Sequence, residues 1–171
     1  MSDDTEGRPV WLLDVDGVVN LFATAADAWP DVQRFTANGF KITWSPTMLG
    51  RIRQVHDSGL AEVRWLTTWG DLANQHLATP FGLPQLTVAG TQPFRDSLTR
   101  WWKLPHAQAV YDTGVRVVWT DDDIACAFGA SAWLEQIGPD RMTAISPLHG
   151  LLPEHLDTIE RWLMEGGLTD E

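Results

Sequence analysis

The feature that most constrains the fold is the alternation of short apolar runs with segments of helical spacing. The runs lie at 10–13, 62–66, 86–89, 115–119 and 143–145. Each is bounded by polar or turn-forming residues, as is typical of strands buried on both faces of a sheet. Because helical segments separate them, the sequence predicts an α/β fold with a parallel five-stranded sheet.

The helices between these runs are indicated by capping residues and apolar spacing. Ser45 and Pro46 open the first, which extends to Gly59, and others are expected at 71–77, 103–111, 124–137 and from Pro153. Residues 17–45 have no clear periodicity and are expected to form an elaborated loop or flap. The length favours a single domain over 1–171, with 1–9 as a flexible tail.

Charge and composition exclude several classes of function. Lys and Arg total 12 against 23 Asp and Glu, and the formal net charge of −11 disfavours strong nucleic-acid binding. The N-terminus does not resemble a secretory signal, and no apolar run approaches the roughly 20 residues of a membrane helix. A single cysteine, Cys126, fits a reducing compartment. The sequence therefore predicts a cytoplasmic protein without membrane contact.

Polar residues follow three of the predicted strands where each strand ends. Asp14 and Asp16 follow the first, Thr67 and Thr68 the second, and the pair Asp121-Asp122 the fourth. In parallel sheets, ligands bind beyond the carboxyl ends of the strands. An Asp-x-Asp pair alone is as typical of a turn as of an active site. Four carboxylates at one sheet edge would repel each other unless a cation lay among them, which favours a metal site.

Other polar residues offer further contacts for a phosphate group. The hydroxyl and amide of Thr67 suit a phosphate oxygen, with Thr68 as the competing candidate, and Lys103 could supply positive charge. Trp69 and Asn74 are predicted to line a substrate mouth, where Trp69 would stack on a base or instead pack in the core. Asp123 is predicted to cap the helix that starts at Ile124.

The order of these motifs resembles that of the haloacid dehalogenase-like superfamily. The matching parts are the segment Asp14-Val15-Asp16-Gly17-Val18-Val19-Asn20, then Thr67, Lys103 and Asp121-Asp122. More narrowly, Leu66-Thr67-Thr68-Trp69 with Asn74, Trp119-Thr120-Asp121-Asp122 and Gly150-Leu151 resemble the domain of this superfamily in Swiss Army Knife RNA repair proteins.

The resemblance implies a fold and a division of roles. The fold would be three-layered and Rossmann-like, with sheet order 5-4-1-2-3 and only a minimal cap. Asp14 would be the nucleophile and Asp16 the general acid and base, while Thr67 and Lys103 would bind the phosphoryl oxygens. Mg²⁺ would be held by Asp14, the carbonyl of Asp16, Asp121 and Asp122. Arg95 and Arg100 are substitutes for Lys103, because the third motif is only Trp102-Lys103.

These features predict a magnesium-dependent phosphohydrolase that forms an aspartyl-phosphate. The sequence does not identify the phosphorylated substrate, and a nucleic-acid end is one candidate. The minimal cap favours a macromolecular substrate or a protein partner. One alternative is a phospho-accepting receiver module, which the order of the motifs disfavours. The other is a non-catalytic scaffold of the same superfamily, which the intact Asp14 and Asp16 disfavour.

Overall fold

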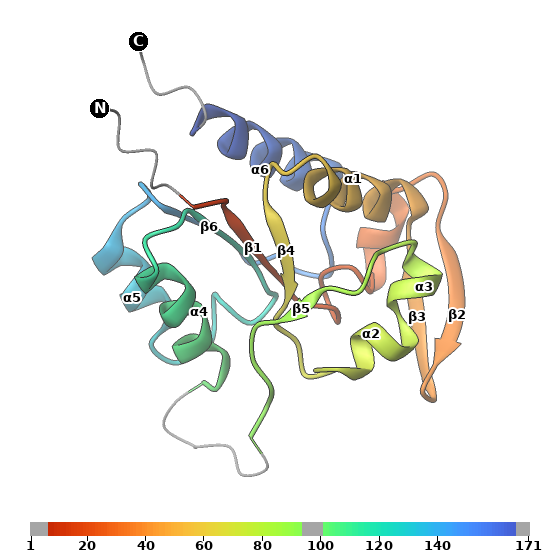
Figure 1. The fold of residues 1–171 in the computed structure, drawn as a ribbon. Helices are drawn as coiled ribbons and strands as arrows, with labels where there is room; N and C mark the ends of the chain where they lie inside the picture. The colour runs from red at the N-terminus through yellow and green to blue at the C-terminus, as the bar shows by residue number, and fades with distance from the viewer. Residues whose placement is uncertain (1–6, 94–100, 167–171) are drawn as a thin grey trace.

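A five-stranded parallel sheet forms the centre of the computed structural model, which describes residues 7–93 and 101–166 (Figure 1). The order is β5-β4-β1-β6-β7, comprising β5 (Thr87–Val88), β4 (Glu62–Trp65), β1 (Val10–Leu13), β6 (Val117–Thr120) and β7 (Met142–Ile145). Counted along the chain within this sheet and read from the β7 edge, the order is 5-4-1-2-3. The labels run higher because β2 and β3 form a separate hairpin.

Helices cover both faces of the sheet, which gives three layers (Figure 1). Trp11 and Leu13 of β1 belong to the apolar cluster on one face, and Val10 and Leu12 belong to the cluster on the other. The first cluster includes side chains of α1 (Pro46–Asp57) and α6 (Pro153–Glu165), and the second those of α4 (Lys103–Asp112) and α5 (Ala130–Ile137). Burial on both faces explains why β1 has no polar residue.

The predicted helices after β3 and β4 are present. The N-cap of α1 is Ser45, whose hydroxyl accepts a hydrogen bond from the amide of Met48 at 3.1 Å. The helix predicted at 71–77 is present as α2 (Leu72–His76), and α3 (Ala78–Phe81) follows it. The first turn of α4 contains Pro105, where proline costs little because these amides have no partner within the helix.

The flap predicted over 17–45 contains regular structure that the sequence analysis missed. It consists of the 3₁₀ helix η1 (Ala23–Ala28) and a hairpin of β2 (Gln33–Ala37) with β3 (Phe40–Trp44). The two turn residues, Asn38 and Gly39, have φ of 49° and 82°. Positive φ at both positions is what a type I′ hairpin turn requires.

The helix predicted at 124–137 begins later, and Asp123 does not cap it. Only α5, from Ala130, is helical, and residues 122–129 form turns and a bend. The amide of Ala125 donates to the Ser146 hydroxyl at 3.1 Å, and the same hydroxyl contacts the carbonyl of Asp122 at 3.1 Å. Because Ser146 takes up these backbone groups, the chain after β6 follows the end of β7 instead of forming a helix.

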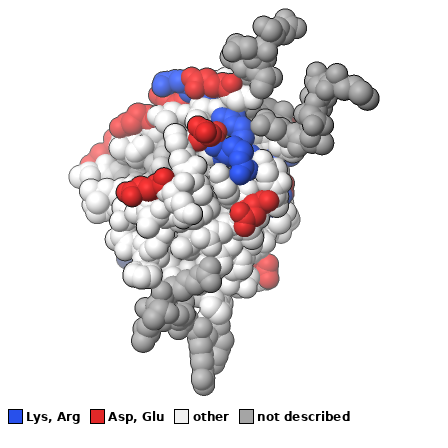
Figure 2. Space-filling model, turned by 90° about the vertical axis from the view of Figure 1, so that its left-hand side faces the viewer, with Lys and Arg blue, Asp and Glu red and all other residues white. Residues whose placement is uncertain are grey.

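Part of the predicted N-terminal tail is attached to the domain. Residues 1–6 lie outside the described part of the chain, whereas Arg8 donates to the carbonyl of Ala61 at 2.8 Å and Pro9 accepts from the amide of Glu62 at 2.7 Å. Among the described helices, none is both long and apolar enough to cross a membrane. On the face shown in Figure 2, acidic side chains are scattered, and basic side chains lie beside acidic ones, mainly in the upper part of the view.

Candidate functional site

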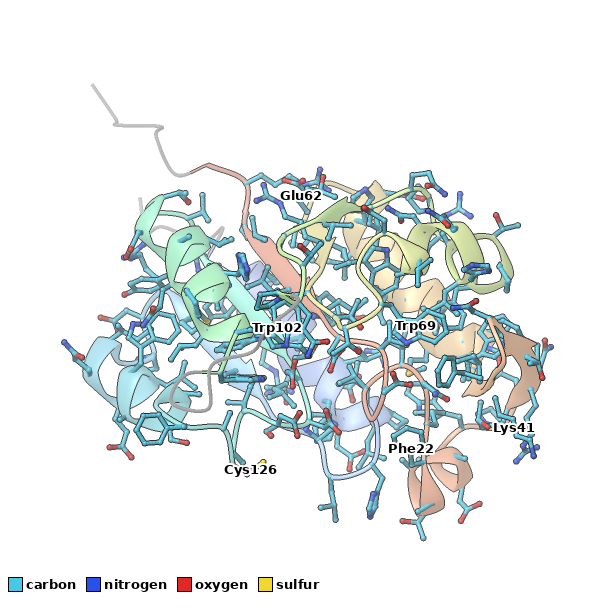
Figure 3. All side chains as sticks on the ribbon, turned by 90° about the horizontal axis from the view of Figure 1, so that it is seen from below. Phe22, Lys41, Glu62, Trp69, Trp102 and Cys126 are labelled. Atoms are coloured by element: carbon cyan, nitrogen blue, oxygen red, sulfur yellow. The ribbon has the colours of Figure 1, made fainter. Side chains whose placement is uncertain are left out.

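Asp14, the predicted nucleophile, and Asp121, a predicted metal ligand, lie together at the carboxyl edge of the sheet. Leu13 of β1 pairs with Trp65 of β4 and with Thr120 of β6, so the three strands end side by side. Asp14 and Asp121 are the next residues of their strands, and both are buried. Figure 3 views the molecule from this side, with Trp102 and Trp69 on either side of the end of β1.

Lys103 joins the two buried aspartates. It is the first residue of α4, and its Nζ lies 2.9 Å from Asp14 Oδ2 and 2.5 Å from Asp121 Oδ2. Burial lowers the pKa of Lys103, but attraction from the two carboxylates outweighs this, so the pKa is raised and the ammonium stays charged. The structure thus brings Lys103 to the predicted place, while Arg95 and Arg100 lie outside the described residues.

Backbone amides fix the other oxygen of each buried aspartate. Asp14 Oδ1 accepts from the amide of Val15 at 2.7 Å, and Asp121 Oδ1 accepts from the amide of Asp123 at 2.9 Å. Burial raises the pKa of Asp121 to about 8, and repulsion from Asp14 adds to the rise while Lys103 opposes it. Keeping Asp121 ionised therefore costs free energy, and a further cation beside it would reduce that cost.

Asp122 completes the acidic group and packs against the turn after β1. A Cβ added to Gly17 would lie 2.3 Å from Asp122 Oδ2, and Gly17 has φ of +72°. Only glycine combines this backbone conformation with so close an approach. Burial raises the pKa of Asp122 to about 6, and repulsion from Asp123 and Asp14 acts in the same direction.

The three carboxylates have the chemistry and spacing of a divalent-cation site. Each of Asp14, Asp121 and Asp122 offers an oxygen, and these oxygens all lie within 4.8 Å of one another. Opposite oxygen ligands of Mg²⁺ lie roughly 4.2 Å apart, twice a bond of about 2.1 Å. Three negative charges against the one positive charge of Lys103 leave two negative charges, which one divalent ion balances. The residues present therefore fit Mg²⁺.

Asp16 lies beside this group but is held by different partners. Its Oδ1 accepts from Asn20 Nδ2 at 2.8 Å, and its Oδ2 accepts from Trp69 Nε1 at 3.0 Å. Asn20 also accepts from the amide of Thr43 at 2.9 Å, so it fastens the hairpin to the turn that carries Asp16. In the sequence Asn20 is only the last residue of the first motif, and the motif does not predict this positioning role.

The residues predicted after β4 have three different placements. Thr67 is fully buried next to the end of β1, and its hydroxyl accepts from the amide of Trp69 at 3.3 Å, which leaves its own proton to donate. Thr68 is exposed. Asn74 does not line the site, because it accepts from Trp65 Nε1 and the Leu86 amide at 3.0 Å each and donates to the Leu86 carbonyl at 2.7 Å. It holds the chain that leads to β5.

A cavity of about 190 Å³ opens directly beside Asp16. Its lining residues come from the hairpin and from the chain after β4: Asp16, Asn38, Phe40, Thr68, Trp69 and Leu72. Thr68 and Trp69 are predicted here from the sequence, whereas Asn38, Phe40 and Leu72 are not. The Asn-Gly turn was the available signal, because a hairpin over 33–44 would have projected from the sheet edge that carries Asp16.

Comparison with known proteins does not assign this chain to a family. No family model, no curated protein and no solved structure matches this chain. Its function is therefore inferred from the geometry of the site.

Proposed function

We propose that the chain is a magnesium-dependent phosphohydrolase that forms an aspartyl-phosphate at Asp14, with a fold of the haloacid dehalogenase-like type. The observation that carries the proposal is the convergence of Asp14, Asp121 and Asp122 around Lys103 at the carboxyl edge of the sheet. The strand order 3-2-1-4-5, counted within the sheet, is that of the first five strands of Rossmann folds, which supports the assignment.

Asp14 and Asp16 would divide the reaction into two displacements. In the first, a carboxylate oxygen of Asp14 attacks phosphorus, the bond from phosphorus to the ester oxygen breaks, and Asp16 donates a proton to that oxygen. In the second, Asp16 takes a proton from water, the water oxygen attacks phosphorus, and the bond to Asp14 breaks. Inorganic phosphate leaves and Asp14 is restored.

The surrounding groups would stabilise the charge of the transferred phosphoryl group. Lys103 contributes a buried ammonium, and Thr67 a hydroxyl and an amide, with Thr68 as the more exposed neighbour. Mg²⁺, held by Asp14, Asp121, Asp122 and the carbonyl of Asp16, would supply further positive charge to the phosphoryl oxygens. Asn20 and Trp69 donate hydrogen bonds to Asp16 and hold its carboxyl group in place beside the cavity.

Two alternative functions receive less support from the structure. A phospho-accepting receiver belongs to folds with strand order 2-1-3-4-5, which differs from the order here. A non-catalytic scaffold would have no need to keep Lys103 buried between two aspartates, since burying charge is costly. A phosphohydrolase therefore explains more features of the site than either alternative does.

The proposed setting is a cytoplasmic enzyme that acts on a phosphate ester, with a nucleic-acid end among the candidates. The excess of acidic residues disfavours tight binding of long nucleic acid by this chain alone. A protein partner could supply such affinity. The association with RNA repair rests on the sequence resemblance alone.

Phosphate release from an aryl phosphate, measured with Mg²⁺ and with chelator, tests the proposal. Asp14→Asn keeps the side chain nearly isosteric while removing the nucleophile, so we expect a loss of at least about 10³-fold in kcat. Asp140→Asn, at an exposed position remote in sequence from the motifs, is the matched control and should keep wild-type activity. Activity that survives chelation, or survives in Asp14→Asn, would overturn the proposal.

A further inference from the structure

The cavity beside Asp16 lies on the side of the site where the leaving group of a substrate would be. Asp16 is the proposed proton donor to the ester oxygen, and it also lines the cavity. A proton donor must lie within hydrogen-bond reach of the oxygen it protonates. The group attached to that oxygen therefore extends toward the other lining residues.

Most of the surface that lines this cavity is apolar, although Asp16, Asn38 and Thr68 are polar. Phe40 at the start of β3 is 62 % exposed, although the hairpin holds it against Trp69, with ring centroids 5.6 Å apart and planes inclined by 67°. Leu72 contributes a further exposed apolar side chain. An aromatic ring placed against Phe40 and Trp69 would bury surface that now faces water, and such contacts add to the gain from burial.

Charge indicates which part of a substrate enters the cavity. Among the residues that the structure describes, none that lines it is basic, and Asp16 is acidic. Lys41, the neighbour of Phe40, lies at the outer edge of the molecule in Figure 3, away from Trp69. A second phosphate or carboxylate would be repelled here, so the cavity suits an uncharged group.

The volume limits the size of that group. The cavity holds about 190 Å³, and an apolar protein cavity of about 150 Å³ is known to bind benzene. The cavity therefore has room for one six-membered ring. We propose, on the basis of the proposed function, that the cavity binds a single uncharged six-membered ring of the leaving group. The substrate class is then a phosphate monoester of an alcohol that carries such a ring close to the ester oxygen.

Benzyl phosphate and ethyl phosphate test this inference, because their leaving alcohols have similar acidity and differ by the ring. We expect kcat/KM with Mg²⁺ to be roughly 3- to 10-fold higher for the benzyl ester, the gain of about 0.5–1.5 kcal/mol from one aromatic contact. Phe40→Ala should remove this preference, and Phe40→Tyr should keep it. Phe22→Ala, at another exposed phenylalanine outside the cavity, should leave it unchanged.

The binding of two non-hydrolysable phosphonates, one with the ring and one without, distinguishes a wrong ring site from a wrong catalytic proposal. 2-Phenylethylphosphonate, in which CH₂ replaces the ester oxygen of benzyl phosphate, should bind wild-type protein with Mg²⁺ roughly 3- to 10-fold more tightly than propylphosphonate by calorimetry, and Phe40→Ala should abolish the difference. Equal affinities, or no binding of either, would overturn the ring site. Selective binding without hydrolysis of either ester would support the ring site and count against the phosphohydrolase.

Discussion

Gly17 connects the two acidic motifs at the scale of single residues. It follows Asp16 directly, and its missing side chain leaves the space that Asp122 occupies. Asp122 in turn is one of the three carboxylates that fit a cation. The geometry of the proposed metal site therefore depends on an uncharged residue that would bind nothing itself.

Replacing Gly17 by alanine should damage cation binding as well as stability. The new Cβ would lie 2.3 Å from Asp122 Oδ2, so Asp122 must move. We expect the Mg²⁺ concentration for half-maximal activity to rise about 10-fold or more, since misplaced supporting groups cost 10- to 100-fold in metal affinity. Gly59→Ala is the matched control, because Gly59 has φ of +83° and open space around its Cβ position. An equal effect in both variants would show that backbone strain alone is responsible.

The acidic residues of the site were predictable one by one, and their supporting residues were not. Asp14, Asp121 and Asp122 follow apolar runs, and parallel pairing brings the ends of such runs together. Asn20 and Asn74 are both polar residues at the edge of a motif, since Asn20 ends the first motif and Asn74 lies just beyond the second. One supports Asp16 and the other holds the chain before β5, and only the folded backbone determines which hydrogen bonds each can make.

At the scale of elements, prediction succeeded where burial sets the pattern and failed where local or tertiary hydrogen bonds do. The strands β1 and β6 can be recognised in the sequence as apolar runs, because both of their faces are buried. Strand β2 is mostly exposed, so it lacks apolar alternation, and only its Asn38-Gly39 turn indicated a hairpin. Residues 124–129 have helical composition, but Ser146 binds the amide of Ala125 and the carbonyl of Asp122 just before this segment.

Asp31 links the segment after η1 to the start of α1 and should make stability depend on pH. Burial raises its pKa, but hydrogen bonds from Ser45 and Thr47 outweigh this and hold the pKa below its ordinary value. Oδ1 accepts from the Ser45 hydroxyl at 2.6 Å, and Oδ2 accepts from the Thr47 amide and hydroxyl at 2.8 and 2.7 Å. Because the folded pKa is depressed, this stabilisation is present above the unfolded pKa and is lost as pH falls through the folded value.

Asp31→Asn should therefore lower the free energy of unfolding at neutral pH by about 0.5 kcal/mol, the low end for a capping carboxylate that solvent partly screens. Urea unfolding at a series of pH values measures this. The difference from wild type should persist from pH 7 to pH 5 and shrink below about pH 4, the ordinary pKa of aspartate. Asp27→Asn, at an exposed position of η1, should show a smaller difference. A difference independent of pH down to pH 3 would contradict the assignment.

At the scale of the whole molecule, the alternation of strands and helices was enough to predict the α/β class and the layers. The sheet edge that carries the site follows from the same pattern, because every strand of a parallel sheet ends on the same side. The cavity beside Asp16 could not be predicted in this way. It depends on how the β2–β3 hairpin is placed against the chain after β4. Asn20 joins the hairpin to the turn that carries Asp16, and Trp69 joins the chain after β4 to Asp16, through hydrogen bonds that leave no sequence pattern.

Cation binding should stabilise the whole fold, because the three carboxylates come from β1 and β6 at the centre of the sheet. A ligand at 100 times its Kd stabilises by about 2.7 kcal/mol, and about 1 kcal/mol raises the melting temperature of a chain of this size by roughly 2–4 °C. Saturating Mg²⁺ should therefore raise the melting temperature by roughly 5–10 °C, and chelator should reverse the rise. Asp122→Asn removes one carboxylate without touching the Lys103 ion pairs, so it should lose most of this increment, whereas Asp140→Asn should keep it. A wild-type melting temperature that does not respond to Mg²⁺ would count against the metal site, whatever the activity.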